Sequence, residues 1–384
     1  MKTDAEGFLY PEVDQGACIK CGACENVCPI LAARKERFPL RTFGAVCTDD
    51  TIRMKSSSGG VFSSFATSVI QSGGVVFGAR FDKRWQVIID SANTIEQLTL
   101  LRGSKYVQAR IDDAYSKAEQ LLKAGKKILF SGTPCQTAGL LCFLHRDYDN
   151  LVTIDVACHG VPSPKVWEAY LTDATRLANK QRSCTLQSYY YHHPYMRAFL
   201  QDLILRPSCH HCRMKNGSSG TDLTIADFWG VQTVCPQLFD NKGTSLILAY
   251  TQKGLDLLDG LHLKRQEVDY NSAVSHNPAL ERSFAPHPRR NHFFACLEDS
   301  DSIISLIEKE LRPPLVQRIK RLVKSALGKQ KNDSHLLAFK QTADSNAIPA
   351  SGLTYDHICS IDFRKKLSGW TNYSVEINWN PLSH

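Results

Sequence analysis

Apolar and polar positions follow helix-like and strand-like spacing in turn from about residue 60. In VFSSFATSVI, the apolar residues Val61, Phe65 and Val69 fall on one face of a helix. The serines at 56–58 are expected to cap this helix. Two apolar runs, VVFGARFD and WQVIIDSA, follow it and predict a pair of strands joined by a hairpin around residues 82–84.

The region after residue 110 alternates between helix and strand patterns. Residues 111–127 have a helical pattern, and they are followed by the strand KILFSG, a helix that begins at Thr133 and Pro134, and the strand NLVTIDVA. The next helix, KVWEAYLTDATRLANK, has Ser163 as its expected cap and Pro164 at its first position. TDLTIADFWG and TSLILAY indicate further strands. This order predicts an α/β fold with a mixed or largely parallel sheet and flanking helices.

The same patterns divide the chain into five parts. We expect a small ferredoxin-like segment at 1–40, the first part of the α/β domain at 41–122, its second part at 123–300, a basic amphipathic helix at 301–330, and a polar tail without firm structure at 331–384. The helix pattern itself covers RPPLVQRIKRLVKSALGK. Its apolar stripe is more typical of docking onto its own protein than of peripheral contact with an anionic membrane or an acidic partner.

Composition places the chain among ordinary globular proteins. Its 384 residues are 43% hydrophobic and 22% charged, and its net charge of +8 is mild. The first residues, MKTDAEGFLYPEVD, are acidic and lack an apolar core, so no signal peptide is expected. No apolar run is long enough for a transmembrane helix. We therefore expect a cytoplasmic location, where 14 cysteines indicate metal or redox chemistry.

The strongest chemical signal is the cysteine run near the N-terminus, CIKCGACENVCP. Its members are Cys18, Cys21, Cys24 and Cys28, and the spacing C-x2-C-x2-C-x3-C-P is typical of 4Fe-4S segments. Zinc is the alternative, but zinc sites use separated pairs of ligands and suit three closely spaced cysteines poorly. In two-cluster ferredoxins the fourth cysteine ligates the other cluster, so Cys28 or Cys47 is the local candidate to complete this site.

A second set of cysteines is scattered through the α/β domain. Its members are Cys135, Cys158, Cys209 and Cys212. The first two follow predicted parallel strands, whose carboxyl ends form the sheet edge where ligands bind. With the C-x-x-C pair they offer four soft ligands that suit a 4Fe-4S cluster or zinc, and the N-terminal motif favours the cluster. Two alternatives stay open: buried structural cysteines, or a nucleophile at Cys135 with His159 as its base.

Two short polar segments offer groups to a phosphate. The first, SSSGG, contains Ser57, Ser58, Gly59 and Gly60. Backbone N–H groups and hydroxyls at a helix start suit an anion, although a simple helix cap explains these residues as well. The second, GSKYVQ, offers Lys105 to a phosphate and Tyr106 to an aromatic ring.

The linked motifs resemble the coenzyme F-420 hydrogenase/dehydrogenase beta-subunit family. They are SSSGGVFS, GSKYVQ, LFSGTPCQTAGL, DVACHGVPSPKVWEAYL, CHHC, DLTIADFWG and NKGTSLIL, in the order and approximate spacing of that family. The resemblance implies an iron–sulfur flavoprotein that binds FAD and one or more 4Fe-4S clusters. It implies that Ser57, Ser58, Gly59, Gly60 and Lys105 lie near the flavin or its phosphates, and that Cys135, Cys158, Cys209 and Cys212 bind an embedded cluster.

The chain departs from the family pattern in two places. The family's fused module usually has two C-x2-C-x2-C-x3-C-P runs. The link that normally joins them, EGFLYPEVD, begins here at Glu6, so we expect the first run to be absent. The turn usually written Gly-Asp-Phe-Trp has Ala226 in place of glycine, and little effect is expected because a small residue is kept.

We therefore expect an oxidoreductase that takes electrons from a ferredoxin or another one-electron donor. The electrons would pass through the N-terminal and embedded clusters to FAD and then, as a hydride, to a deazaflavin coenzyme or another small acceptor. Lys105 and His159 are the candidate catalytic residues. One alternative is a zinc-stabilised module that binds nucleic acid or an acidic protein, which the cysteine spacing and modest charge disfavour. The other is a truncated relative that has lost electron entry.

Overall fold

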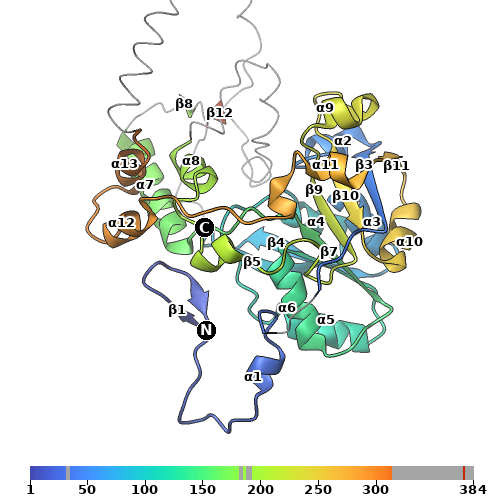
Figure 1. Cartoon of the computed structure of the whole chain (residues 1–384), viewed down its shortest axis with the longest axis horizontal. Helices are drawn as coiled ribbons and strands as arrows, with labels where there is room; N and C mark the ends of the chain where they lie inside the picture. The colour runs from blue at the N-terminus through green and yellow to red at the C-terminus, as the bar shows by residue number, and fades with distance from the viewer. Residues whose placement is uncertain (32–34, 181–184, 187–192, 314–374, 377–384) are drawn as a thin grey trace, which may run out of the picture.

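A computed structural model describes most of the chain (Figure 1). The described residues are 1–31, 35–180, 185–186, 193–313 and 375–376. The basic helix pattern at 312–329 and the tail at 331–384 lie almost wholly outside these ranges. Within them, no helix is both long enough and apolar enough to span a membrane.

An eight-stranded mixed sheet organises the α/β domain (Figure 1). Its order is β11–β3–β10–β9–β7–β6–β4–β5. The strands are β3 (Arg41–Cys47), β4 (Val75–Phe81), β5 (Val87–Ala92), β6 (Ile128–Gly132), β7 (Leu151–Val156), β9 (Leu223–Asp227), β10 (Ser245–Ala249) and β11 (Leu263–Glu267). The neighbours β9, β7, β6 and β4 are parallel, and the outer pairs are antiparallel. The predicted α/β fold is therefore confirmed, as is the hairpin, which is formed by β4 and β5.

The register of the central strands brings their carboxyl ends to one edge of the sheet. Gly132 of β6 pairs with Asp155 of β7, and Val156 of β7 pairs with Ile225 of β9. The segments that leave these three strands therefore start side by side. In open α/β sheets this edge is where ligands bind.

Helices cover both faces of the sheet. One face carries α3 (Val61–Gln71), α4 (Ile95–Leu101) and α10 (Gln252–Asp259). The opposite face carries α5 (Ala114–Lys123) and α6 (Pro134–Leu144), which pack against the alternate side chains of the strands. Over β3 and β10, this second face is covered by α9 (Val231–Val234) and α11 (Tyr270–Val274).

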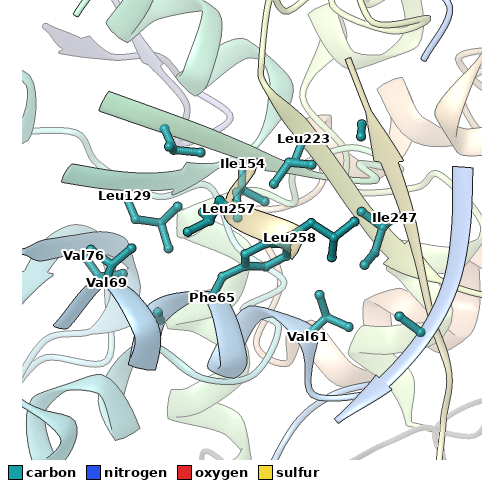
Figure 2. Packing of buried hydrophobic residues seen from close by; sticks show 14 of the residues in the cluster. Val61, Phe65, Val69, Val76, Leu129, Ile154, Leu223, Ile247, Leu257 and Leu258 are labelled. Atoms are coloured by element: carbon teal, nitrogen blue, oxygen red, sulfur yellow. The ribbon is translucent and has the colours of Figure 1, made fainter. Parts of the chain in front are cut away.

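The core beneath α3 and α10 is aliphatic apart from a few phenylalanines (Figure 2). Val61, Phe65 and Val69 lie on the face of α3 that packs on the sheet, as their spacing predicts. Leu257 and Leu258 of α10 join the same cluster. Burying a side chain of this kind contributes roughly 1.5–3 kcal/mol relative to leaving it exposed. This packing fixes the position of α3 and, with it, the SSSGG segment at its N-terminus.

A layer of helices lies next to the β5 edge (Figure 1). Its members are α7 (Pro164–Lys180), α8 (Pro194–Leu200), α12 (Arg290–Ala295) and α13 (Ile303–Glu310). Ser163 caps α7 as predicted, because its Oγ accepts a hydrogen bond from the Val166 N–H at 3.2 Å. The sequence pattern does not predict α8, which forms where Tyr195 and Phe199 become buried in this layer.

Other short elements complete the described structure. They are β1 (Lys2–Thr3), β2 (Leu9–Tyr10), α1 (Ala23–Asn26), α2 (Asp50–Met54), β8 (Thr185–Leu186), β12 (Val375–Glu376), and the 3-10 turns η1 (Pro207–His211), η2 (Pro236–Leu238) and η3 (Pro278–Leu280). The sequence pattern predicts neither β3 nor β11. Thr42 and Gly44 interrupt the apolar run of β3, and β11 is a polar edge strand that pairs with β3 alone.

Candidate functional site

A cavity of about 620 Å³ opens at the carboxyl edge of the parallel strands. Residues 131–133, 156–162 and 225–227, at and beyond the ends of β6, β7 and β9, form part of its wall. Residues 56–58 and 101–107 complete much of the remainder. The volume lies within the range of about 300–1,000 Å³ that small-molecule sites occupy.

The SSSGG segment is held in place by its own hydroxyl groups. Ser57 Oγ accepts a hydrogen bond from the Ser104 N–H at 2.9 Å, and Ser58 Oγ donates to the Thr244 carbonyl at 2.9 Å. Both serines line the cavity. Their hydroxyls therefore join this segment to residues 101–107 and to the start of β10.

Gly59 is required by the packing of this segment on the sheet. Its N–H donates to Ser245 Oγ at 3.0 Å, and a β-carbon at position 59 would lie 2.5 Å from the Ala45 carbonyl oxygen. The predicted close approach of the backbone is therefore to β3 and β10. Gly60, which lines the cavity, is the N-cap of α3 at a φ of 83°, so the predicted serine caps are wrong.

The first turn of α3 contributes to the cavity wall. Val61, Phe62 and Ser63 all line the cavity. The N–H groups at the start of an α-helix have no partner within the helix and carry partial positive charge. This turn therefore offers donors that suit an anionic group such as a phosphate.

Lys105 lines the cavity, and its amine is bound to the backbone. Nζ donates to the carbonyls of Leu100 and Arg102 at 3.1 and 2.6 Å. These carbonyls lie at the C-terminal end of α4, where a cation is favoured. Lys105 thus adds positive charge to the wall, and its catalytic role stays a prediction.

His159 also lines the cavity and is held by a carboxylate. Its Nε2 lies 2.8 Å from Asp202 Oδ1, and its ring stacks on Phe284 with centroids 4.5 Å apart. Such a contact fixes the orientation of the ring and selects one tautomer. Nothing in the sequence pattern pairs His159 with Asp202, and the catalytic role of His159 stays a prediction.

Strand order and loop pairing bring the scattered cysteines toward the edge of the sheet where the cavity opens, and Cys158 lines the cavity. Cys135 lies in the first turn of α6, and Cys158 follows β7, as predicted. Cys209 lies in η1, and a bridge between Pro162 and Leu205 holds the start of that turn beside the segment that follows Cys158. Three distant stretches of sequence therefore meet here.

Close backbone packing keeps these segments together. A β-carbon at Gly160 would lie 3.3 Å from Cys209 Cβ and 2.8 Å from Leu205 Cδ1, so a larger residue would force these side chains to shift. The N–H of Cys212 donates to Ser283 Oγ at 3.0 Å, which ties the second cysteine of the pair to the chain before α12. The C-x-x-C pair is thus fixed from two sides.

The thiols of this set interact electrostatically. Burial raises the pKa of Cys158 well above its ordinary value, and the thiols of Cys209 and Cys135 raise it further. Burial also raises the pKa of Cys209 to about 11. Cys135 is exposed to solvent, yet the surrounding protein raises the pKa of its thiol as well, with a contribution from Cys212. Bound iron would supply the positive charge that deprotonation of these thiols requires.

The arrangement of the thiols bears on which metal they suit. In the described ranges, no group of three or more cysteine, histidine or acidic side chains converges closely enough to hold one metal ion. A zinc ion needs four ligands within about 2.3 Å of a single atom. In a 4Fe-4S cluster each thiolate binds a different iron, so the ligands stand further apart. Thiols that stand apart from one another are therefore compatible with a 4Fe-4S cluster.

The N-terminal cysteines lie on a loop that extends away from the sheet (Figure 1). Cys18, Cys21 and Cys24 are exposed, and Cys28 is half-buried. No side chain between residues 11 and 31 is buried. The organisation of this loop therefore depends on what the cysteines bind, as it does in other small metal-dependent segments.

The chain before this loop is anchored beside the C-x-x-C pair. Phe8 is fully buried, and Glu6 pairs with the buried Arg290, whose Nη1 donates to Glu6 Oε1 at 2.9 Å. Arg206 donates to the Leu9 carbonyl at 2.8 Å and stands immediately before η1. The N-terminal segment is therefore attached to the same stretch of chain that carries Cys209.

The chain after the loop returns to the same region. The Arg37 N–H donates to the Asn216 carbonyl at 2.9 Å, and its Nη2 donates to the Thr221 carbonyl at 2.6 Å. Asn216 and Thr221 follow Cys212 in sequence. Both ends of the cysteine loop are thus tied to residues 205–221.

Three charged residues of this region were not predicted from the sequence. They are Asp202, Arg206 and Lys215. Arg206 and Lys215 flank the C-x-x-C pair symmetrically, each three residues from the nearer cysteine. That flanking pattern is the signal that could have identified them.

Comparisons with known proteins match the two cysteine-bearing parts of the chain. Residues 125–272 match the family model for the C terminus of the beta subunit of coenzyme F420 hydrogenase/dehydrogenase, and residues 10–33 match a 4Fe-4S binding domain. A solved structure of the F420-reducing NiFe hydrogenase complex from Methanosarcina barkeri is similar at 18% identity, with a TM-score of 0.43. The alignment covers 71% of this chain and 91% of that one. No curated protein matches the sequence.

The two family matches support an iron–sulfur redox protein of the oxidoreductase class. One contains the N-terminal cysteine run, and the other contains the four scattered cysteines. The resemblance noted in the motifs is thereby confirmed: residues 10–33 match a 4Fe-4S binding domain, and residues 125–272 match the C-terminal part of the coenzyme F420 hydrogenase/dehydrogenase beta-subunit family.

Proposed function

We propose that the protein is an iron–sulfur flavoprotein oxidoreductase. The reaction moves electrons from a ferredoxin or another one-electron donor to a small hydride acceptor, for which a deazaflavin coenzyme is the leading candidate. FAD, when bound, supplies the conversion of one-electron to hydride chemistry. A reducing, cytoplasmic setting suits free thiols in this number.

One observation carries the proposal: a single cavity is lined by both kinds of predicted cofactor residue. Cys158 and His159 share this cavity with the SSSGG serines and Lys105. A cluster ligated by Cys158 would therefore lie next to whatever molecule the cavity binds. This juxtaposition is what electron transfer between a cluster and a flavin requires.

The cavity wall suits a flavin dinucleotide in its chemistry. Ser57, Ser58, Gly60 and the first turn of α3 offer hydroxyl and N–H donors to a phosphate, with Gly59 packed behind them and Lys105 adding positive charge. Tyr106, Phe199 and Trp229 give the wall aromatic surface that suits a ring system. His159, oriented by Asp202, is the group proposed to hold or move a proton at its other ring nitrogen.

The cysteines divide between two proposed clusters. Cys135, Cys158, Cys209 and Cys212 would bind the embedded cluster, and Cys18, Cys21, Cys24 and Cys28 the N-terminal one. Anchoring of residues 6–10 and of Arg37 beside the C-x-x-C pair supports a short route between the two. Electrons would enter at the exposed loop and leave through the cavity.

Anaerobic purification of the full chain tests the proposal. We expect a brown protein with broad absorbance near ~400 nm, equal amounts of iron and sulfide, and FAD released on denaturation. As a matched comparison, addition of zinc to the apoprotein should not reproduce this spectrum. A colourless protein that holds only zinc, or one that cannot bind FAD, would contradict the proposal.

A further inference from the structure

Lys215 is a buried cation between the embedded cysteines and the cavity wall. Its side chain is 8% exposed, and its Nζ donates to the Cys158 carbonyl at 2.7 Å and to the Ala279 carbonyl at 2.6 Å. Cys158 and Ala279 both line the cavity. Lys215 therefore connects the segment that carries a proposed cluster ligand to the wall of the proposed flavin site.

Among the described residues, the charge of Lys215 has no acidic counterpart. None of the carboxylates in the described ranges forms an ion pair with it, and its hydrogen-bond partners are both neutral carbonyl oxygens. Burying a cation without an anion is costly, so a compensating negative charge is expected nearby. Burial lowers the pKa of the Lys215 amine, and the thiols of Cys158, Cys212 and Cys209 act in the opposite direction. These thiols become anionic when a metal binds, so they can supply that charge.

We propose that Lys215 is the counter-charge of the embedded cluster and that it raises the cluster's reduction potential. The inference rests on the proposed function, in which Cys158 and the C-x-x-C pair are ligands. Four thiolates and the cluster core together carry net negative charge. One-electron reduction adds another negative charge to the cluster while the donor loses one electron. A fixed ammonium nearby therefore stabilises the reduced state more than the oxidised state.

Arg206, the other cation close to these thiols, has a different set of contacts. Its guanidinium lies 3.9 Å from the centroid of the Tyr10 ring and donates to the Leu9 carbonyl and to Ser208 Oγ. It is partly exposed, whereas Lys215 is enclosed. Water screens exposed charges much more than enclosed ones, so Lys215 is expected to have the larger electrostatic effect.

The test compares Lys215→Met, which removes the charge at similar length, with Lys215→Arg, which keeps it. Both are made in the full chain carrying Cys21→Ser, so that the N-terminal cluster does not contribute to the signal. We expect Lys215→Met to keep its iron and to lower the midpoint potential, measured by an EPR-monitored redox titration, by about 59 mV. For one electron that is a tenfold change in the ratio of reduced to oxidised cluster. The midpoint potential of the Lys215→Arg variant should stay near that of the parent chain carrying Cys21→Ser.

Lys264→Met is the matched control. Lys264 also donates to a backbone carbonyl, that of Gln237 at 3.3 Å, but it is exposed and lies away from the proposed ligands. The midpoint potential measured in the Lys264→Met variant should equal that of the parent chain. Loss of iron in Lys215→Met that Lys215→Arg restores would also support a counter-charge.

Two results would overturn the inference. One is an unchanged potential in Lys215→Met with full iron content, and the other is equal loss of iron in both Lys215 variants. A parent protein whose iron content is insensitive to Cys209→Ala would instead contradict the proposed function. The two failures are therefore distinguishable.

Discussion

The two cysteine sets of this protein are organised in opposite ways. Cys18 to Cys28 occupy one short exposed loop in which no side chain is buried. The other four cysteines come from the first turn of α6, the segment after β7, and η1 with the residue that follows it, and they approach one another only because the chain folds. One set is thus defined by spacing and the other by topology, and mutations should affect the two differently.

The surroundings of the two sets differ as much as their sequence. Lys20, the basic residue within the N-terminal run, is exposed, whereas Lys215 beside the embedded set is buried. Solvent screens the first charge and leaves the second largely unscreened. Single charges should therefore tune the proposed embedded cluster and have little effect on the proposed N-terminal one.

The largest expected effect is the loss of iron when one of the four cysteines that the fold brings together is replaced. Cys209→Ala removes one proposed ligand, and we expect the protein to lose about half of its iron, since two clusters of equal size contribute. The measurement is iron and acid-labile sulfide per chain. Cys235→Ala is the matched control. Cys235 is fully buried, but it lies in the hydrophobic core beneath α9 and α11 and is not a proposed ligand. Equal iron in the two variants would refute the ligand assignment.

Removing one of the N-terminal cysteines Cys18 to Cys28 should leave the proposed embedded cluster in place. We expect Cys21→Ser to lose about half of the iron and the double variant with Cys209→Ala to lose nearly all of it. Because the loop contributes no buried side chain, the thermal midpoint should change little. If Cys21→Ser alone removes all the iron, the two sites are not independent and the comparison fails.

The anchor of the loop provides a test of stability. Arg290→Ala removes a buried guanidinium from Glu6 and from the Leu205 carbonyl, to which its Nε donates at 2.9 Å. We expect a loss of roughly 2–3 kcal/mol in the free energy of unfolding, measured with urea, because the remaining partners stay partly buried.

Arg41→Ala is the control for this experiment. Arg41 also pairs with a glutamate, Glu267, but both side chains are well exposed. Exposed pairs contribute little, so its urea midpoint should barely move. A similar loss of unfolding free energy in both variants would mean that the buried Arg290–Glu6 pair contributes no more to stability than the exposed Arg41–Glu267 pair.

The smallest effect is a pH dependence of the stability that arises from Asp155. This residue lies on β7, the strand that precedes Cys158. Burial raises the pKa of Asp155 to about 7, against hydrogen bonds from Ser219 and Thr224 that favour the ionised form. The native state then retains a proton that the unfolded chain releases near pH 4, so stability falls as pH rises from about 4 through 7. Asp155→Asn should remove this part of the slope, about 1 kcal/mol per pH unit. Urea unfolding at pH 5 and pH 7.5 measures it, and an unchanged slope would contradict the assignment.

Much of the fold is readable in the sequence. The central strands and α3, α5, α6 and α7 appear in it because their apolar residues keep a regular period. The sequence pattern does not predict the edge strand β11 because its side chains are polar. It does not predict α8 because the apolar residues of this helix become a core only through their tertiary neighbours. The serine caps were misplaced because Ser57 and Ser58 bond to other segments.

The sequence by itself determined the N-terminal cysteine run, the α/β class and the cysteines available for a second site. Ligand spacing within one loop is a local property, so it needs no fold to be recognised. Tertiary structure alone decided that Asp202 holds His159, that Arg37 and Arg206 tie the loop beside η1, and that Lys215 is buried against two carbonyl oxygens. These contacts join residues far apart in the chain, and their energies depend on burial, which spacing cannot reveal.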